Sequence, residues 1–317
     1  MNNLLNAVVV GVGSLGQHHA RIYAQNPKTS LLGVVDINST TAHEIAAKWN
    51  TTAFTALDQI HDQIDLVSVA VPTIHHFEIA SWCIEHGIPV LVEKPIAINI
   101  EEGNALVEKA EKHGVLLQVG HIERFNPAVV ALGEYLDKPL FIESHRLGPP
   151  VPRIKDVGVI LDLMIHDLDL ILALVRSEVK TIDAVGVPIL TTQEDIANAR
   201  IRFESGCLAN VTVSRVTPER QRKIRFFQKD TYLSLDYMKP ELQIYRKIEQ
   251  NGKITIDHIR PDLKTHEPLA AEIDSFIDCV YEKREPIVSG RDGVRALHLA
   301  EIITGQVREV SQSILNF

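Results

Sequence analysis

The chain has 317 residues, more than one hydrophobic core usually organises, so we expect two domains. Its 41 acidic and 32 basic residues give a net charge of −9, which argues against nucleic acid or an anionic membrane surface as the main partner. The three cysteines lack the spacing of a metal site or a disulfide framework, and no stretch reaches the ~20 apolar residues of a membrane span. We therefore expect a cytoplasmic protein with no metal site and no membrane segment.

The first motif is a glycine-rich turn between a short β-branched strand and a helix. It has the pattern G-x-G-x-x-G, in the strand and helix context that gives this pattern its meaning. The first glycine permits the turn, the second lets the backbone approach a pyrophosphate, and the third lets helix and strand pack closely. The residues that we assign to dinucleotide binding here are Gly11, Gly13, Ser14, Leu15 and Gly16.

An acidic residue follows at the end of the second predicted strand, Leu31 to Val35. Asp36 lies 20 residues after Gly16, where a carboxylate can accept hydrogen bonds from the ribose of an adenosine. Because a carboxylate repels a 2′-phosphate and no arginine follows Asp36, the sequence favours NAD over NADP as the cofactor. The alternative is a glycine-rich turn that binds no ligand.

Strands and helices then alternate as far as residue 120, which predicts a doubly wound parallel sheet. Ligands of such sheets bind at the carboxyl ends of the strands. Two predicted strand ends carry the further residues that we assign to cofactor binding, namely Val71, Pro72, His76, Glu93, Lys94 and Pro95. Lys94 is also a candidate acid, base or substrate anchor, and the alternative for it is an exposed loop lysine.

The pattern changes after Gly120, and there we place the boundary between a Rossmann domain, residues 1–120, and an α+β domain, residues 121–317. From Thr181 to His258 one predicted strand follows another, joined by short polar or glycine turns. This pattern predicts a large, open and mostly antiparallel sheet, so the fold class is α/β followed by α+β. One face of that sheet would be left without helices, and we expect a homodimer or homotetramer built on it.

The helix predicted from Val157 to Val175 is apolar on nearly every side, yet it contains Asp162, His166, Asp167 and Asp169. Ionisable groups in a buried helix are costly unless they are paired or used. Asp162 and His166 are four residues apart, so the carboxylate can orient the imidazole and raise its basicity. This pair predicts a general base and its orienter. The alternative is an acidic residue near the helix N-terminus and an ordinary core histidine.

Taken together, these segments resemble the glucose-fructose oxidoreductase / inositol dehydrogenase family. The matching motifs run in the same order along almost the whole chain and are Gly11-x-Gly13-x-x-Gly16, Val71-Pro72 to His76, Glu93-Lys94-Pro95, Arg124-Phe-Asn-Pro127, Asp162-x-x-x-His166, Glu267-Pro-Leu and Pro286-Ile-Val-Ser-Gly290. Within the family, residues 121–128 and 156–169 most resemble the members that oxidise UDP-N-acetylglucosamine at C3, which feed amino-sugar synthesis for lipid A and surface glycans.

The resemblance implies that Lys94, Asp162 and His166 meet at the nicotinamide of NAD. His166 would take the proton of a sugar hydroxyl and Lys94 would stabilise the developing alkoxide, although the sequence leaves open which of the two is the base. The residues assigned to a substrate that carries a diphosphate are Arg124, Asn126, Arg146 and Arg153. Simple solvent exposure is the alternative for each arginine.

Other functions remain open for a chain of this kind. Some family members bind NAD as sensors or repressor partners without turnover, and these would be expected to lack the lysine or the histidine that this chain retains. Others are NAD-dependent glycosidases, which oxidise a sugar only transiently. The substrate is also open among other sugars, UDP-sugar uronates and inositol-type polyols. An aminotransferase that consumes the keto product is a candidate partner.

Overall fold

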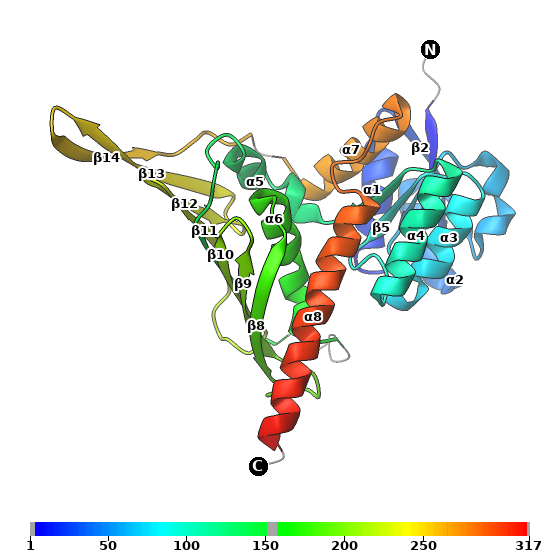
Figure 1. The fold of residues 1–317 in the computed structure, drawn as a ribbon. Helices are drawn as coiled ribbons and strands as arrows, with labels where there is room; N and C mark the ends of the chain where they lie inside the picture. Colours follow the sequence, from blue (N-terminus) through cyan, green and yellow to red (C-terminus); the bar gives the residue numbers. More distant parts are fainter. Residues whose placement is uncertain (1–3, 151–156, 265, 316–317) are drawn as a thin grey trace. The chain divides into compact units, whose positions relative to one another are not determined.

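The computed structural model describes residues 4–150, 157–264 and 266–315 (Figure 1). The chain forms two compact units. One contains the residues up to Ile122 together with Glu267–Val294, and the other contains Glu123–His266 together with the residues from Arg295 onward. The sequence placed residues 267–294 in the second domain, whereas the structure groups them with the first unit. No helix among the described residues is long and apolar enough to cross a membrane.

The first unit is built on a six-stranded parallel sheet, in the order β3-β2-β1-β4-β5-β6. The predicted doubly wound parallel sheet is therefore confirmed. Its strands are β1 (Leu5–Val10), β2 (Thr29–Val35), β3 (Thr52–Phe54), β4 (Leu66–Val69), β5 (Val90–Glu93) and β6 (Leu117–Gly120). Its helices are α1 (Gly16–Gln25), α2 (Ser39–Trp49), α3 (His76–Glu85), α4 (Ile100–His113) and α7 (Pro268–Glu282), with short 3₁₀ turns at Leu57–Gln59, His61–Gln63 and Thr73–His75.

Local sequence signals set the ends of these helices. The Asn38 side chain accepts hydrogen bonds from the backbone N–H groups of Thr40 and Thr41 at the start of α2, and the Asn99 side chain accepts one from Glu102 at the start of α4. Asparagine is a preferred N-cap for this reason. Helix α4 ends at Gly114, whose φ of 65° lies in the left-handed region that glycine adopts without strain.

Helix α7 explains the grouping of residues 267–294 with the first unit. Its buried residues Leu269, Ile273, Phe276 and Ile277 belong to the same core cluster as residues of β1 and α1. At its N-terminus, Glu267 pairs with Arg21 of α1, with 2.5 Å between the carboxylate oxygen and Nη2. The apolar face of α7 therefore belongs to the core of the first unit.

The second unit contains an eight-stranded sheet, in the order β14-β13-β12-β11-β7-β10-β9-β8. All neighbours are antiparallel except β7 and β10, so the prediction of a large, mostly antiparallel sheet is confirmed. The strands are β7 (Phe141–Leu147), β8 (Val179–Val187), β9 (Ile196–Phe203), β10 (Leu208–Ser214), β11 (Gln221–Gln228), β12 (Thr231–Asp236), β13 (Glu241–Gln250) and β14 (Lys253–Ile259). The other elements are a 3₁₀ turn (Ile122–Phe125), α5 (Pro127–Leu132), a π-helical turn (Ile160–Met164), α6 (Ile165–Val175) and α8 (Gly290–Leu315), whose residues from Arg295 onward belong to this unit.

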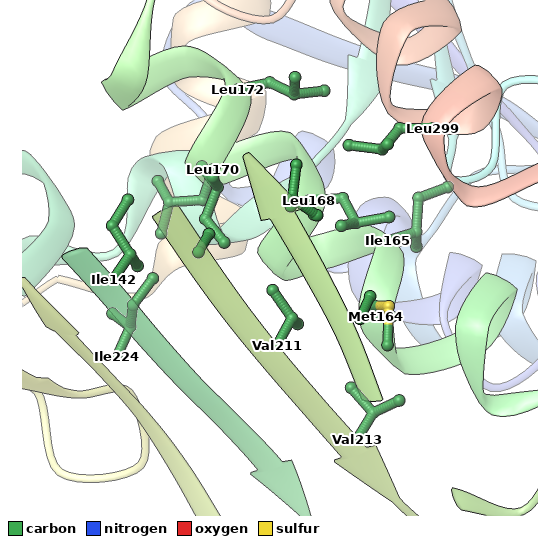
Figure 2. Packing of buried hydrophobic residues seen from close by; sticks show 14 of the residues in the cluster. Ile142, Met164, Ile165, Leu168, Leu170, Leu172, Val211, Val213, Ile224 and Leu299 are labelled. Carbon is green, nitrogen blue, oxygen red and sulfur yellow. The ribbon is translucent and has the colours of Figure 1, made fainter. Parts of the chain in front are cut away.

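One face of this sheet forms the core of the second unit. Alternate residues of the central strands, among them Ile142, Val211 and Ile224, are fully buried beneath α6 (Figure 2). Helix α6 contributes Ile165, Leu168 and Leu170, and α8 contributes Leu299. Helix α6, which contains the candidate base, is therefore held against the sheet along its length.

Candidate active site

The glycine-rich turn has the backbone geometry that dinucleotide binding requires. Gly11 has a φ of +80°, and its N–H donates to the carbonyl of Val35 at 2.7 Å. A Cβ at Gly16 would lie 1.8 Å from the carbonyl oxygen of Gly11, so only glycine fits there. By contrast, a Cβ at Gly13 would meet nothing within 4 Å, which leaves this backbone open to a close ligand. These residues therefore fit a pyrophosphate at the start of α1.

Asp36 is held at the end of β2 by two backbone hydrogen bonds. Its Oδ2 accepts from the N–H of Val12 at 2.9 Å and its Oδ1 accepts from the N–H of Asn38 at 2.8 Å. Each carboxylate oxygen can accept a second hydrogen bond, so the ribose hydroxyls of an adenosine remain acceptable partners. The carboxylate also fixes the glycine-rich turn through Val12.

His76 joins the two other strand ends that the sequence assigned to the cofactor. Its Nδ1 lies 2.8 Å from the carbonyl oxygen of Pro95 and its Nε2 lies 2.9 Å from that of Val71. Burial lowers the pKa of His76, while the two carbonyl contacts and the charge of Glu93 act in the opposite direction. Both ring nitrogens are thus engaged with the backbone, so His76 ties the loop after β4 to the loop after β5.

Glu93 is anchored by a residue that the sequence reasoning missed. Its Oε1 lies 3.0 Å from Nε2 of His19, a fully buried residue of α1. The carboxylate also occupies the space beside Gly120, where a Cβ would lie 2.9 Å from it. The available signal was a histidine three residues after Gly16 on the buried side of the predicted helix. Lys94 and Pro95 follow Glu93 and are half-buried, while Pro72 is exposed.

Asp162 and His166 lie where the helix changes its winding. The N–H of Ile165 donates to the carbonyl of Ile160, five residues back, so Ile160–Met164 is a π-helical turn before α6 begins. The sequence predicted regular helix throughout this segment, and that detail was wrong. Both side chains are half-buried. Such π turns occur frequently at functional sites because they change the direction of side chains within a helix.

Asp167, the next residue, forms a buried ion pair with Arg146 of β7. Arg146 donates from Nε to Oδ2 at 2.8 Å and from Nη2 to Oδ1 at 3.3 Å, and its Nη1 reaches Glu123 at 3.0 Å. The hydroxyl of Ser144 donates to the same Asp167 carboxylate at 3.0 Å. Burial alone would lower the pKa of Arg146, but the charges of Asp167 and Glu123 outweigh it and raise that pKa. The Arg146 side chain is 4 % exposed, and its guanidinium group donates hydrogen bonds to two carboxylates of the same unit.

Asp169 is paired in the same way with Arg124, whose Nε and Nη2 donate to the two carboxylate oxygens at 2.6 and 2.8 Å. Asn126 caps α5, accepting a hydrogen bond from the N–H of Ala128 at 3.0 Å, and is buried. Arg124, Asn126 and Arg146 are thus engaged in contacts within the second unit, and their assignment to a diphosphate stays a prediction. Arg153 lies outside the described residues.

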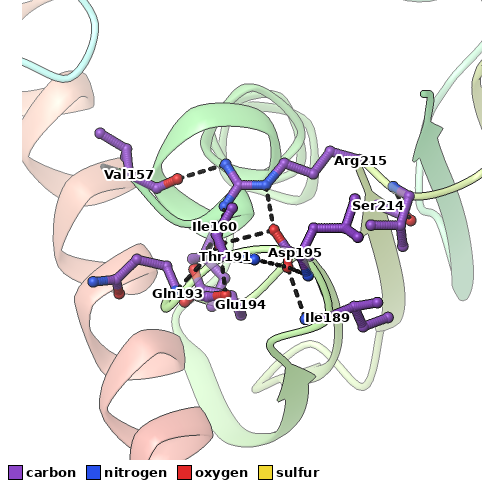
Figure 3. Close-up of polar contacts among 11 residues, drawn as sticks. Val157, Ile160, Ile189, Thr191, Gln193, Glu194, Asp195, Ser214 and Arg215 are labelled. Carbon is purple, nitrogen blue, oxygen red and sulfur yellow. Dashed lines mark hydrogen bonds and ion pairs between the residues drawn. The ribbon is translucent and has the colours of Figure 1, made fainter. Parts of the chain in front are cut away.

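A second buried network fixes the start of the π-helical turn (Figure 3). Arg215 donates from Nη1 to the carbonyl of Val157 at 2.7 Å and from Nε to Oδ1 of Asp195 at 2.7 Å. Burial opposes ionisation of Asp195, but Arg215 and the N–H groups of residues 189–191 hold its pKa well below the usual value. Glu194 accepts a hydrogen bond from the N–H of Ile160 at 3.3 Å. These contacts position the segment that contains Asp162 and His166.

Known protein families account for both units. A family model described as an oxidoreductase family with an NAD-binding Rossmann fold matches residues 5–121, and the model of the GFO/IDH/MocA C-terminal domain matches residues 141–232. The chain belongs to the GFO/IDH/MocA oxidoreductase family. It is therefore an NAD-binding oxidoreductase, in agreement with the open backbone at Gly13 and the carboxylate of Asp36.

Relatives within the GFO/IDH/MocA family differ in substrate. The chain is 38 % identical over 299 residues to the UDP-N-acetylglucosamine 3-dehydrogenase of Acidithiobacillus ferrooxidans, a match that covers 92 % of this chain and 94 % of that protein. A solved structure of that dehydrogenase superposes with a TM-score of 0.90 and 36 % identity over 96 % of this chain and 98 % of that one. The scyllo-inositol 2-dehydrogenase (NAD(+)) of Bacillus subtilis is 27 % identical over 97 % of this chain and 95 % of its own.

Proposed function

We propose that this chain is an NAD-dependent dehydrogenase that oxidises UDP-N-acetylglucosamine to its 3-keto form. The observation that carries the proposal is the 38 % identity to a dehydrogenase of that substrate over 92 % of the chain. The inositol dehydrogenase relatives match at lower identity, so a polyol or another sugar is the competing substrate.

The proposed chemistry divides between a few side chains. NAD, when bound, accepts the hydrogen of the sugar carbon together with its electron pair. His166 takes the hydroxyl proton, and Asp162 orients the imidazole for that role. Lys94 donates a hydrogen bond to the reacting oxygen and stabilises the negative charge that develops on it. His19 and His76 support this chemistry indirectly, because they hold Glu93 and Pro95 on either side of Lys94.

The test is a panel of nucleotide sugars, free sugars and inositols with NAD, followed by NADH formation. We expect NADH with UDP-N-acetylglucosamine and little with glucose or inositol, because the nucleotide supplies binding energy remote from the reacting carbon. An aminotransferase that consumes the keto product serves as a trap where the equilibrium is unfavourable. Release of free sugar without NADH would instead indicate an NAD-dependent glycosidase, and a silent panel with intact NAD binding would indicate a sensor.

Variants test the assigned residues. His166→Ala and Lys94→Ala should each lower kcat by about 100-fold or more, the usual contribution of an acid or base. NAD affinity should change far less, because most of it comes from the other residues that we assign to the dinucleotide. The exposed residues His113 and Lys138 provide matched controls as alanine variants. Asp162→Asn should have a smaller effect and shift the pH profile of kcat. If single-turnover rates of the His166 and Lys94 variants equal the parent rate, these assignments are wrong.

We also propose a homo-oligomer in the cytoplasm. The three cysteines, Cys83, Cys207 and Cys279, are all buried and free, as is usual in a reducing compartment. The open face of the eight-stranded sheet carries a row of aromatic side chains that we assign to the contact between copies, namely Phe141, Phe227, Tyr232 and Tyr245.

A further inference from the structure

A concave surface in the second unit has an unusual charge for this acidic protein. It lies between the segment Thr217–Gln221, which leads into β11, and the turn Asp236–Lys239, which follows β12, and its volume is about 550 Å³. Its lining includes four cationic side chains and two carboxylates, which are Arg220, Arg222, Lys223, Lys239, Glu219 and Asp236. We call it the basic concavity. Small-molecule sites typically occupy ~300–1,000 Å³, so its size suits a ligand larger than a single phosphate.

The cations of the basic concavity are incompletely neutralised. Lys223 pairs with Asp236, with 3.4 Å between Nζ and Oδ2. Within the described parts of the chain, Arg220, Arg222 and Lys239 form no ion pair with a carboxylate. A chain with nine more acidic than basic residues thus concentrates positive charge in one hollow. Such a hollow attracts anions and repels cations.

Among the cations of the basic concavity, Arg222 is the best candidate to bind an anion. It is the cross-strand partner of Arg146, so the two side chains lie on the same face of the sheet. The carboxylates of Asp167 and Glu123 are already bonded to Arg146. Partial burial lowers the pKa of Arg222, which is an exposed residue, and the charge of Arg146 lowers it further, while the charges of Glu123 and Asp167 act in the opposite direction. A bound phosphate would relieve this repulsion, and the guanidinium fork matches phosphate oxygens in a bidentate geometry.

The basic concavity is also connected to the helix of the candidate base. Arg222 is the strand partner of Arg146, Arg146 is bonded to Asp167, and Asp167 follows His166 directly in α6. The hollow and the base thus belong to one continuous set of contacts within the second unit.

We propose that the basic concavity binds the diphosphate of the substrate, with Arg222 as its principal contact. This inference rests on the proposed function for the identity of the substrate, and it replaces Arg124 and Arg146, which are used in internal ion pairs. Arg220 and Lys239 supply further positive charge to the same ligand. A free phosphate acting as an effector has the same chemistry, so the test separates the two sources.

The experiment measures the binding of UDP by calorimetry, without NAD and without turnover, to the parent chain and to Arg222→Gln. We expect the variant to lose about 10- to 100-fold in UDP affinity, the usual effect of removing one charged hydrogen-bond donor. Arg225→Gln is the matched control, because Arg225 lies on the same strand but pairs with Glu143 at 2.8 Å on the opposite face. Uridine, pyrophosphate and inorganic phosphate are titrated in parallel. Thermal unfolding checks that both variants fold.

Several outcomes decide the matter. Loss of UDP affinity in Arg222→Gln alone, with a raised KM and a nearly unchanged kcat for the nucleotide sugar, supports the proposal. Equal UDP affinity in all three proteins overturns it, even if UDP-N-acetylglucosamine is turned over. Inorganic phosphate binding as tightly as UDP, with no effect of Arg222→Gln on KM, also overturns it and identifies an effector site. UDP binding through Arg222 without any turnover of the nucleotide sugar supports the site and contradicts only the proposed reaction.

Discussion

Asp36 combines two tasks in one carboxylate. Its two oxygens accept the N–H groups of Val12 and Asn38, so the group ties the glycine-rich turn to the end of β2. We propose that the same carboxylate presents negative charge to the ribose of NAD. The remaining lone pairs suit the two hydroxyls of an NAD ribose and oppose the 2′-phosphate of NADP. Replacing it therefore changes both the turn and the choice of cofactor.

We predict that Asp36→Ala lowers the ratio of NAD affinity to NADP affinity by about tenfold or more, the size expected for one lost charged interaction. NAD affinity itself should fall as well, because the turn loses its tie to Val12. Titration of both cofactors, followed through the fluorescence of Trp49 and Trp82, measures the ratio. The exposed Asp58 supplies the control variant Asp58→Ala, which should leave the ratio unchanged. Equal affinities of the parent chain for NAD and NADP would contradict the role of the ribose carboxylate.

The ion pairs of the second unit could not be predicted from the sequence. The sequence indicated that acidic groups in an apolar helix need partners. It separately led us to assign several arginines to a diphosphate. The structure joins the two sets, pairing Asp169 with Arg124 and Asp167 with Arg146, 45 and 21 residues apart. No periodicity within a short window reports such a pairing. Residues of the glycine-rich turn were predictable because their chemistry depends on local spacing alone.

The π-helical turn at Ile160–Met164 could not be predicted either, because an apolar run is compatible with both an α-helix and a π-helix. Gly158 is one residue near this turn whose identity is related to the π-helical winding. A Cβ at this position would lie 1.8 Å from Oε1 of Glu194, so the glycine makes room for the carboxylate that receives the N–H of Ile160. Strand positions in the second unit were easier to predict, because alternation of buried and exposed residues along each strand is a strong local signal.

We predict that Gly158→Ala displaces Glu194 and destabilises the protein by about 1–3 kcal/mol, the range for losing a buried polar contact of a helix start. The kcat should fall in parallel, because the turn that contains Asp162 shifts. Thermal unfolding and steady-state kinetics measure the two effects. Gly133→Ala is the control, because a Cβ there meets its nearest atom at 3.5 Å. The double variant with Glu194→Ala removes the clash, so a penalty for Gly158→Ala that is undiminished in this background would contradict the explanation.

The eight-stranded sheet leaves a second face with its own pattern. Rings follow one another across five adjacent strands, with centroid separations of 5.4, 5.0, 5.6 and 4.2 Å, in the order Phe141, Phe227, Tyr232, Tyr245 and His258. The four rings from Phe141 to Tyr245 are partly buried and His258 is exposed, whereas alternate residues of β7, β11, β12 and β13, such as Ile142, Ile224 and Leu233, are fully buried. Aromatic residues on such a face are typical of contacts between proteins.

This row predicts that copies of the chain associate through the open sheet, and light scattering at micromolar concentration should report a dimer or tetramer. The variant Phe227→Ser with Tyr232→Ser removes two adjacent rings from the centre of the row and should shift the population toward monomer, because aromatic anchors near the centre of an interface supply most of its binding energy. Circular dichroism checks that the variant folds. Tyr281→Ser, which changes an exposed tyrosine of α7, is the control and should keep the parent mass. A parent chain that is monomeric at this concentration would mean that the aromatic row serves only the stability of the sheet.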